Sequence, residues 1–403
     1  MSTTLRATAF LTLVLPGTAS AQAVLVVDKA GGPGSTHTSL AAAIAAAQDG
    51  DFLLVRSGFY QEDVVLDGKG LRIQADAGAT PYVNDIRVEN LGPGQRAAIG
   101  GLITGGLAAS PGPSILLRND QGPVWLQVPS SAWLGVTARI EDCAEVVLES
   151  TTVATSFISS VCQGGICYEA AMTIERSTVA LFDCFVQGLD GSECSTVWDD
   201  GTIGLLAIDS TVWIHGSTIQ GGTGAGDCGG ATSPGKGGAG LELRGTSVVD
   251  LVDNSILGGG GGGSCCGGGG PDGPIFNVVS GKLNKHGNRA RRFDTESLVR
   301  SGQATSLSYQ GKPADLVFLL IAPAPSAFAF LPNVLGPVVV PPTSTVTRLG
   351  KADAAGMLTL GLNAPPVLGG ARTFYLQVAA LNHAAGEVVM GTPTPLHVLA
   401  PGY

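Results

Sequence analysis

The 403-residue sequence contains few charged and few aromatic side chains, with Asp, Glu, Lys and Arg at 13% and Phe, Trp and Tyr at 5%. After the N-terminal apolar run over 7–15, it also contains no run of about 18 uninterrupted apolar residues, because the apolar stretch 316–340 is broken by four prolines. We find no phosphate loop, no nucleophile elbow and no His-Glu-x-x-His zinc motif. These absences argue against a compact α/β enzyme and a helical membrane protein. The 60 glycines instead favour a repeat protein with many turns.

The first 23 residues have the pattern of an export signal. Arg6 provides a weakly positive start, 7–15 is an apolar run too short to span a bilayer, and Pro16 ends it. Small residues then allow cleavage after Ala21 or Ala23. We therefore expect a protein that is secreted or held at the cell surface and has no transmembrane segment.

The eight cysteines fit an oxidising compartment, in which an even number can pair. All of them lie in the middle of the chain, and several fall in successive loops, so bridges between neighbouring repeats are expected with the pairing left open. The disulfide candidates are Cys143, Cys162, Cys167, Cys184, Cys194, Cys228, Cys265 and Cys266.

Charge is divided unevenly along the chain. Residues 24–281 contain 27 acidic and 11 basic side chains, a net charge of −16, whereas 282–403 contain 5 and 10, a net charge of +5. An acidic surface repels polyanions unless cations bridge the two. This argues against a nucleic-acid partner, and against a polyuronate partner in the absence of a divalent ion.

Four segments of the acidic region repeat one pattern of apolar and polar residues, with spacings of 33, 33 and 37 residues. Alternation of apolar residues in them predicts strands, and stacking such repeats would bury a continuous apolar ladder. The segments begin at Val146, Val179, Val212 and Val249. A second strand is expected upstream in each repeat, at 138–141, 172–175, 206–209 and 241–244. Irregular loops follow, and their rising glycine content predicts tight turns with positive φ.

The acidic region opens with a different pattern. Thr38 or Ser39 can cap a helix over Leu40–Gln48, which Asp49 and Gly50 would end. Short strands are expected directly after it. A helix in this place would cover the open apolar end of the stack of repeats.

The residues around that helix resemble the N-terminal module of the pectin-lyase-like right-handed β-helix superfamily. The resemblance lies in 39–44, 49–51, 58–62 and 68–73. It implies an all-β fold, a right-handed parallel β-helix over 24–281 with an N-terminal capping helix. The same opening occurs in pectinesterase-like enzymes, lyases and non-catalytic surface proteins, so the resemblance implies no single activity.

The repeat pattern ends near Lys282. We expect a basic linker over 282–299, either solvated or docked on the acidic solenoid, and then a domain over 300–403 whose strand-like segments are separated by Pro and Gly. These segments predict a small antiparallel β-sandwich. It resembles the C-terminal sandwich appendages of secreted bacterial proteins.

Acidic residues recur at equivalent places on the predicted upstream strands. Glu141, Glu175 and Asp209, with Glu242 in the next repeat, would form one outward column with rungs about 4.8 Å apart. Such a column could hold a Ca²⁺ ion or supply a catalytic acid and base. The alternative is a solvated face whose charges nearby arginines relieve.

A second outward column contains aromatic residues. Phe182, Trp213 and His215 could form a platform on which sugar rings stack, and Asp199 and Asp200 beside Trp198 are candidate ligand-binding residues in a loop. The alternatives are that Trp213 is covered, that His215 ends a turn and that the two aspartates belong to an ordinary turn.

Two functions remain open from the sequence. The residue sets of pectinesterases, pectate lyases and polygalacturonases do not occur at matching positions, which favours a non-catalytic protein that binds glycan or matrix through its outward face. The alternative is a polysaccharide lyase or hydrolase centred on Glu141, Glu175 and Asp209. An enzyme requires acids that converge in a groove, whereas a binding protein can pair each acid with an arginine.

Overall fold

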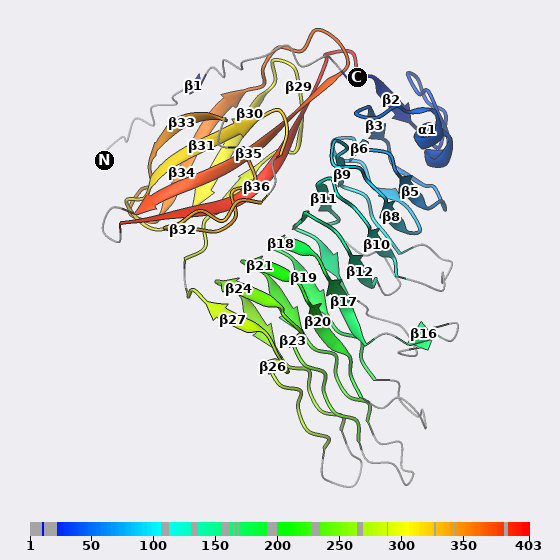
Figure 1. Ribbon diagram of the computed structural model, residues 1–403. Coiled ribbons are helices and arrows are strands. Elements are labelled where there is room, and N and C mark those ends of the chain that lie inside the picture. Colours follow the sequence, from blue (N-terminus) through cyan, green and yellow to red (C-terminus); the bar gives the residue numbers. More distant parts are fainter. Residues whose placement is uncertain are drawn as a thin grey trace, which may run out of the picture. The chain divides into compact units, whose positions relative to one another are not determined.

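The computed structural model describes residues 10–11, 22–105, 113–129, 136–154, 162–163, 166–167, 169–191, 200–226, 234–263, 269–287, 289–325, 328–341, 344–382 and 386–403. The chain divides into two compact units. The solenoid unit contains Leu25–Asn288, and the C-terminal unit contains Arg289–Tyr403 together with Met1–Val24. The protein is all-β, with long parallel sheets in the solenoid unit (Figure 1).

The largest sheet of the solenoid unit has ten strands, and every neighbouring pair in it for which a register is given is parallel. In spatial order its strands are β2 (Val24–Val27), β3 (Phe52–Val55), β6 (Arg72–Ala75), β9 (Ala97–Gly100), β11 (Val124–Gln127), β13 (Val146–Glu149), β18 (Thr178–Phe182), β21 (Thr211–His215), β24 (Val248–Val252) and β27 (Lys282–Lys285).

A second parallel sheet has eight strands, one from each successive turn of the chain. They are β5 (Val64–Asp67), β8 (Ile86–Glu89), β10 (Ile115–Arg118), β12 (Ala138–Glu141), β17 (Ala170–Glu175), β20 (Ile203–Ile208), β23 (Leu241–Arg244) and β26 (Phe276–Val278).

Shorter strands form a third side. They are β4 (Gly58–Phe59) and β7 (Pro81–Tyr82), which pair with each other, and the four-stranded sheet of β14 (Thr152–Val153), β19 (Phe185–Gln187), β22 (Thr218–Gln220) and β25 (Ser255–Leu257). One rung therefore visits three sheets in turn, as β17, β18 and β19 do. A separate antiparallel pair, β15 (Cys162–Gln163) and β16 (Ile166–Cys167), follows β14 in the chain.

The register confirms the alignment of the four repeats in the ten-stranded sheet. Val146 pairs with Val179, Val179 with Val212, and Val212 with Val249. Their inward side chains belong to one continuous apolar core that runs through all three sheets.

The alignment of the upstream strands is wrong in one repeat. Thr173 pairs with Leu206 and Glu175 with Ile208, so the equivalent segment is 205–208 and not 206–209. This segment is apolar on both faces, and therefore its alternation does not show which residues point inward. Asp209 therefore does not lie in the column of Glu141 and Glu175. Glu242 lies in the neighbouring column, that of Arg139 and Thr173.

Polar side chains form ladders inside the two short corners of each rung. The N–H of Cys143 donates to Ser177 Oγ, the N–H of Ser177 to Ser210 Oγ, and the N–H of Ser210 to Ser247 Oγ. A parallel ladder at the other corner joins the N–H of Cys184 to Ser217 Oγ. Each of these buried backbone N–H donors at a corner thereby has an acceptor in the next rung.

These ladders explain why two of the expected disulfide cysteines are free thiols. Cys143 and Cys184 are buried at ladder positions that Ser177 and Ser217 occupy in the following rungs, rather than in loops. Cys162 and Cys167 face each other in the backbone register of β15 and β16, and their side chains lie outside the described part of the structure. Cys194, Cys228, Cys265 and Cys266 also fall outside the described residues.

The glycine-rich segments were expected to be irregular turns, and the structure corrects this. We use the name glycine bundle for two sets of segments. The outgoing segments follow β19, β22 and β25 and are 188–191, 221–226 and 258–263. The returning segments precede β20, β23 and β26 and are 200–202, 234–240 and 269–275. They run side by side beyond the sheets in Figure 1, and backbone hydrogen bonds connect the two layers in series. The N–H of Gly222 donates to Thr202 O, that of Gly238 to Gly222 O, that of Gly259 to Gly238 O, and that of Gly273 to Gly259 O, each at 2.8–2.9 Å.

The glycines of the bundle are required for space and not for positive φ. None of the bundle glycines in the described residues has a φ in the left-handed region. A Cβ on Gly222, Gly238 or Gly259 would instead lie 1.8–1.9 Å from a carbonyl oxygen of a neighbouring segment. Other positions of the bundle, Thr223, Lys236, Gly260 and Gly263, are exposed. Gly260 and Gly263 lie three residues apart, and a Cβ on either would meet no atom closer than 3.8 Å. A three-residue period with no hydrogen bonds within a segment is the geometry of a polyproline-II or polyglycine helix.

α1 (Leu40–Ala46) begins at Ser39, whose Oγ accepts the N–H of Ala42 at 3.2 Å. The helix ends at Ala46 rather than Gln48. Leu40, Ala43 and Ile44 are buried in the same core as the strands of the solenoid. No helix within the described part of the chain is long and apolar enough to cross a membrane.

The C-terminal unit contains two sheets that share one apolar core. One sheet consists of β1 (Phe10–Leu11), β34 (Met357–Asn363), β30 (Ala304–Gln310) and β28 (Arg292–Thr295). The other consists of β29 (Leu298–Arg300), β36 (Glu387–Leu399), β35 (Ala371–Asn382), β31 (Leu316–Ala322) and β33 (Thr345–Lys351), with β32 (Val334–Leu335) paired to β36.

The segment 282–299 is not a linker, contrary to the expectation from its charge. Its first residues form β27, which pairs with β24 as the last strand of the ten-stranded sheet. β28 and β29 belong to the C-terminal unit, in which Arg289 forms an ion pair with Glu387 at 2.6 Å. The basic residues of the segment therefore serve as edge-strand and ion-pairing residues within the two units.

Candidate functional site

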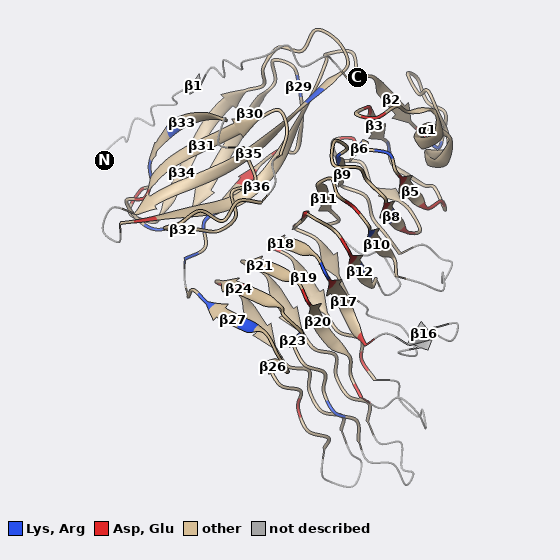
Figure 2. Cartoon of the chain, in the orientation of Figure 1, with Lys and Arg blue, Asp and Glu red and all other residues tan. Residues whose placement is uncertain are grey.

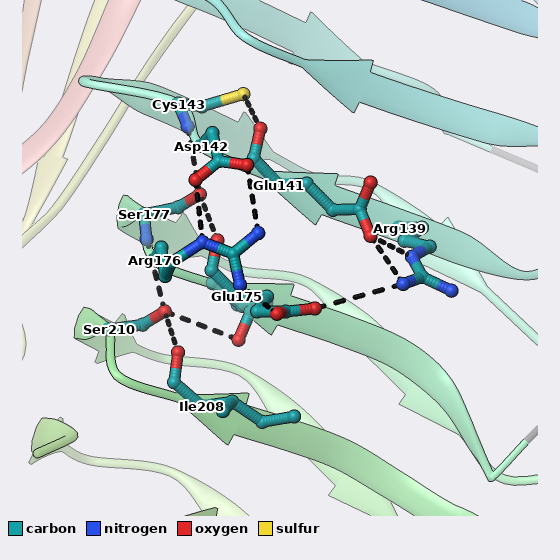
Figure 3. Close-up of polar contacts among 10 residues, drawn as sticks. Arg139, Glu141, Asp142, Cys143, Glu175, Arg176, Ser177, Ile208 and Ser210 are labelled. Carbon is teal, nitrogen blue, oxygen red and sulfur yellow. Dashed lines mark hydrogen bonds and ion pairs between the residues drawn. The ribbon is translucent and has the colours of Figure 1, made fainter. Parts of the chain in front are cut away.

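The outward face of the eight-stranded sheet contains the acids selected from the sequence. Glu141 and Glu175 are register partners on β12 and β17. Arg139 forms ion pairs with both of them, and the distance to Glu175 is 3.7 Å. Arg176 forms a further ion pair with Glu175 and another with Asp142, the latter at 2.7 Å (Figure 3). The two glutamates are thus bound by arginines from two neighbouring rungs.

The protonation of this network follows from these contacts. Hydrogen bonds to Asp142 and Glu175 raise the pKa of Arg176, and the hydrogen bond from Arg176 lowers the pKa of Asp142 below its usual value. A general acid requires a carboxyl group whose pKa is raised towards neutrality. The arrangement around Asp142 has the opposite effect.

The same pairing continues along the sheet. Arg118 binds Glu89 at 3.0 Å, and Arg244 binds Glu242 and Glu169. Figure 2 shows acidic and basic positions following one another along β8, β10, β12 and β17. These pairs form an ion-pair ladder across successive rungs, so the column of acids is neutralised locally rather than gathered into an anionic site.

Asp209 lies away from Glu141 and Glu175, at the corner after β20 with a φ of 48°. Its carboxylate accepts the N–H and the hydroxyl of Thr246 at 2.8 and 3.1 Å, and the backbone hydrogen bond contributes most to lowering its pKa. Within the described residues, no group of three or more Asp, Glu, His and Cys side chains has the arrangement of a metal site. Asp209 is thus not brought together with Glu141 and Glu175, and each of the three carboxylates has a partner within the protein.

The aromatic platform expected on the ten-stranded sheet is also corrected. Phe182, Trp213 and His215 are 0%, 4% and 0% exposed. His215 lies against Phe182, with ring centroids 5.5 Å apart, and Trp213 stacks on His286 at 5.8 Å. The outward positions of this parallel sheet are largely apolar, and a parallel sheet is typically covered on both faces. These side chains are therefore packed and offer no open surface to a sugar.

Of the loop residues selected from the sequence, Trp198 and Asp199 lie outside the described residues. Asp200 is exposed, and its carboxylate accepts the N–H of Lys236 at 2.7 Å. This contact joins two returning segments of the glycine bundle. Asp200 therefore has a structural role in the arrangement of the bundle.

The third side of the solenoid presents a different surface. We use the name third-side face for the outward residues of β4, β7, β14, β19, β22 and β25, together with Ile103, which bridges to Tyr82. Phe59 is 65% exposed and stacks on Tyr82, with ring centroids 4.5 Å apart and planes 10° from parallel. Phe185 is 36% exposed in the outward column that continues to Thr218 and Ser255.

The third-side face could not be predicted from alternation in the sequence, because its strands are two or three residues long and too short to show it. A positional signal does exist in the four repeats that contain β14, β19, β22 and β25. The outward residue follows two positions after a corner residue with positive φ, as Phe185 follows Asp183 and Thr218 follows Gly216.

The C-terminal unit has a shallow pocket of about 290 Å³, lined by Asn333, Val334, Leu335, Gly386 and Glu387. Glu387 forms the ion pair with Arg289. Among the described lining residues the titratable side chain is that of Glu387, which is already paired.

No family model matches the chain, and no curated protein matches it. Among solved structures, the chain is similar to a superoxide reductase (neelaredoxin) from Ignicoccus hospitalis at 10% identity, over 27% of this chain and 80% of that one, with a TM-score of 0.17. A single-residue variant of that reductase gives 9% identity with the same coverage and TM-score. At such a TM-score the similarity supports no conclusion about fold or function.

Proposed function

We propose that this protein is a secreted or cell-surface β-solenoid that binds a polysaccharide or extracellular matrix through an outward face of the solenoid, without catalysis. The observation that supports this proposal is the ion-pair ladder. Glu141 and Glu175 are bound by Arg139 and Arg176, and Asp209 is engaged by Thr246. A polysaccharide lyase or hydrolase requires an acid and a base that are available to the substrate.

The proposal includes the finer description of the fold. We infer a right-handed β-helix of the pectin-lyase-like type, in which α1 closes one end and the C-terminal unit is an antiparallel β-sandwich. The right-handed sense is supported by the strong preference of parallel crossover connections for that hand. Closure by α1 is supported by its three buried apolar residues in the solenoid core, and the sandwich by the core shared between two sheets.

The test is a panel of soluble polysaccharides incubated with the full chain, with and without Ca²⁺, and scored for binding and for product release. The expected result is binding without release of reducing or unsaturated ends, and with no dependence on Ca²⁺. Release of such ends that the substitution Glu175→Gln abolishes would refute the proposal and favour the lyase or hydrolase. Absence of binding to every member of the panel would also count against it.

A further inference from the structure

We propose that the third-side face is the binding surface, and that its ligand is an uncharged polysaccharide that lies along the stacking direction of the rungs. This inference rests on the proposed function and names the surface and the class of ligand. It follows from a comparison of the three sides of the solenoid.

The other two sides are occupied by their own side chains. The outward face of the eight-stranded sheet is taken up by the ion-pair ladder, so a ligand there would have to displace arginine–carboxylate contacts. On the ten-stranded sheet the outward Phe182, Trp213 and His215 are buried. Among the described residues of the solenoid unit, the third-side face is the side on which exposed aromatic rings, those of Phe59 and Phe185, lie beside small polar groups.

The composition of this face selects against charged ligands. The segments 57–61, 79–84, 101–105, 152–153 and 185–191 contain one charged residue, Asp190, and 218–226 and 255–263 contain none. Asp190 accepts the N–H of Thr223 at 2.7 Å. In a unit with a net charge of −16 over 24–281, a face whose single charged residue is an aspartate lacks the cations that would attract a polyanion.

The aromatic part of the face suits the apolar side of a sugar ring. Phe59 and Tyr82 stack on adjacent strands, and Phe59 retains 65% of its exposure although Tyr82 covers one side of it. The C–H face of a pyranose can pack against the exposed ring, and the phenol hydroxyl of Tyr82 can both donate and accept a hydrogen bond.

The polar part of the face repeats from rung to rung. Gln187 pairs in register with Gln220, and Thr218 with Ser255. Gln187 and Gln220 are both partly exposed. Rungs about 4.8 Å apart present these groups at a spacing comparable to the length of one pyranose residue, so each sugar of an extended chain can meet a new amide or hydroxyl. Such groups match sugar hydroxyls, which both donate and accept.

The experiment measures affinity of the full chain for soluble neutral polysaccharides, xyloglucan, galactomannan and mixed-linkage β-glucan, beside polygalacturonate as the charged comparison. The variants are Phe59→Ala and Gln220→Ala. The matched control is Phe330→Ala, an exposed phenylalanine of the C-terminal unit at 47%. Circular dichroism of each variant verifies that it is folded.

We expect Phe59→Ala to weaken binding of a neutral polysaccharide about tenfold, the equivalent of one well-packed aromatic contact. Phe330→Ala should leave it unchanged, and binding should be equal at low and high salt. Unchanged affinity in both face variants, with a neutral polysaccharide still bound by the parent, would overturn the assignment of the surface and leave the proposed function standing. Preference for polygalacturonate would overturn the ligand class. Failure to bind any polysaccharide would instead count against the proposed function.

Discussion

Gly259→Ala should disrupt the glycine bundle, whereas Gly260→Ala, one residue further in the same glycine run, should not. A Cβ on Gly259 would lie 1.9 Å from Gly222 O and 2.5 Å from Gly222 C. Both are backbone atoms of the adjacent outgoing segment and cannot rotate away as the end of a side chain can. At Gly260 the nearest atom is Thr223 Cγ2 at 3.8 Å, an ordinary contact.

The magnitude follows from what the segment must lose when it moves. Gly259 donates its N–H to Gly238 O and accepts the N–H of Gly273, and relieving the overlap separates both pairs. Two lost backbone hydrogen bonds, with donors left unsatisfied inside the bundle, cost about 2–4 kcal/mol. Reduced freedom of the unfolded chain returns about 0.4–1 kcal/mol in either variant. Gly260→Ala should therefore be neutral or slightly stabilising.

The assay is thermal unfolding of the full chain combined with hydrogen exchange of peptides from 218–226 and 234–240. A net loss of about 2 kcal/mol corresponds to a decrease of roughly 4–8 °C in the midpoint for a unit of this size. Exchange in both peptides should accelerate in Gly259→Ala and remain at the parent rate in Gly260→Ala and Gly263→Ala. If all three variants behaved alike, the run would be a flexible loop and the bundle would be refuted.

Three further predictions concern buried groups. Arg291 and Asp315 form a buried ion pair, and in Asp315→Asn the arginine would keep an unpaired charge. This substitution should therefore lower the free energy of unfolding of the C-terminal unit by about 3–5 kcal/mol in urea titrations. A loss below about 1 kcal/mol would contradict this. Burial raises the pKa values of the Cys143 and Cys184 thiols to about 12, so both should resist iodoacetamide in the native protein at pH 8 and react after denaturation. Peptide mass spectrometry measures the labelling. Labelling of either thiol in the native state would argue against the ladder positions. Burial raises the pKa of Asp120 to about 7 from 3.8, so the folded state binds more protons than the unfolded state between these values and stability should fall as pH rises from about 4 to about 7. Asp120→Asn, which can still accept the Leu91 N–H, should remove that decrease, and an unchanged pH profile in denaturant melts would refute the assignment.

Part of this fold could be predicted from the sequence because its physical signal is local. The valines at 146, 179, 212 and 249 recur with apolar partners two residues on, so the register of β13, β18, β21 and β24 follows from this repeated alternation. The register of 205–208 could not be obtained in this way. Leu206 is covered by apolar neighbours on the outward face, and a segment apolar on both faces fits either register.

The candidate site was harder to predict because it depends on contacts that are distant in sequence. Whether Glu175 is free or paired depends on Arg139, which lies in the preceding rung. The burial of Trp213 depends on what covers the sheet, which no periodicity shows. The glycine bundle was missed for a related reason, since a glycine chosen for close backbone contact and one chosen for positive φ look the same in a sequence.

The serine ladder has a consequence for how such a chain can change in length. From Cys143 to Ser247, each rung contacts the next through a backbone N–H and a serine hydroxyl, as Ser177 does with Ser210 and Ser210 with Ser247. The joint between two rungs therefore does not depend on which rungs they are, in keeping with nearest-neighbour coupling in repeat proteins. Tandem duplication or loss of a complete 33-residue repeat would preserve every ladder contact except at one junction, where an equivalent contact replaces it.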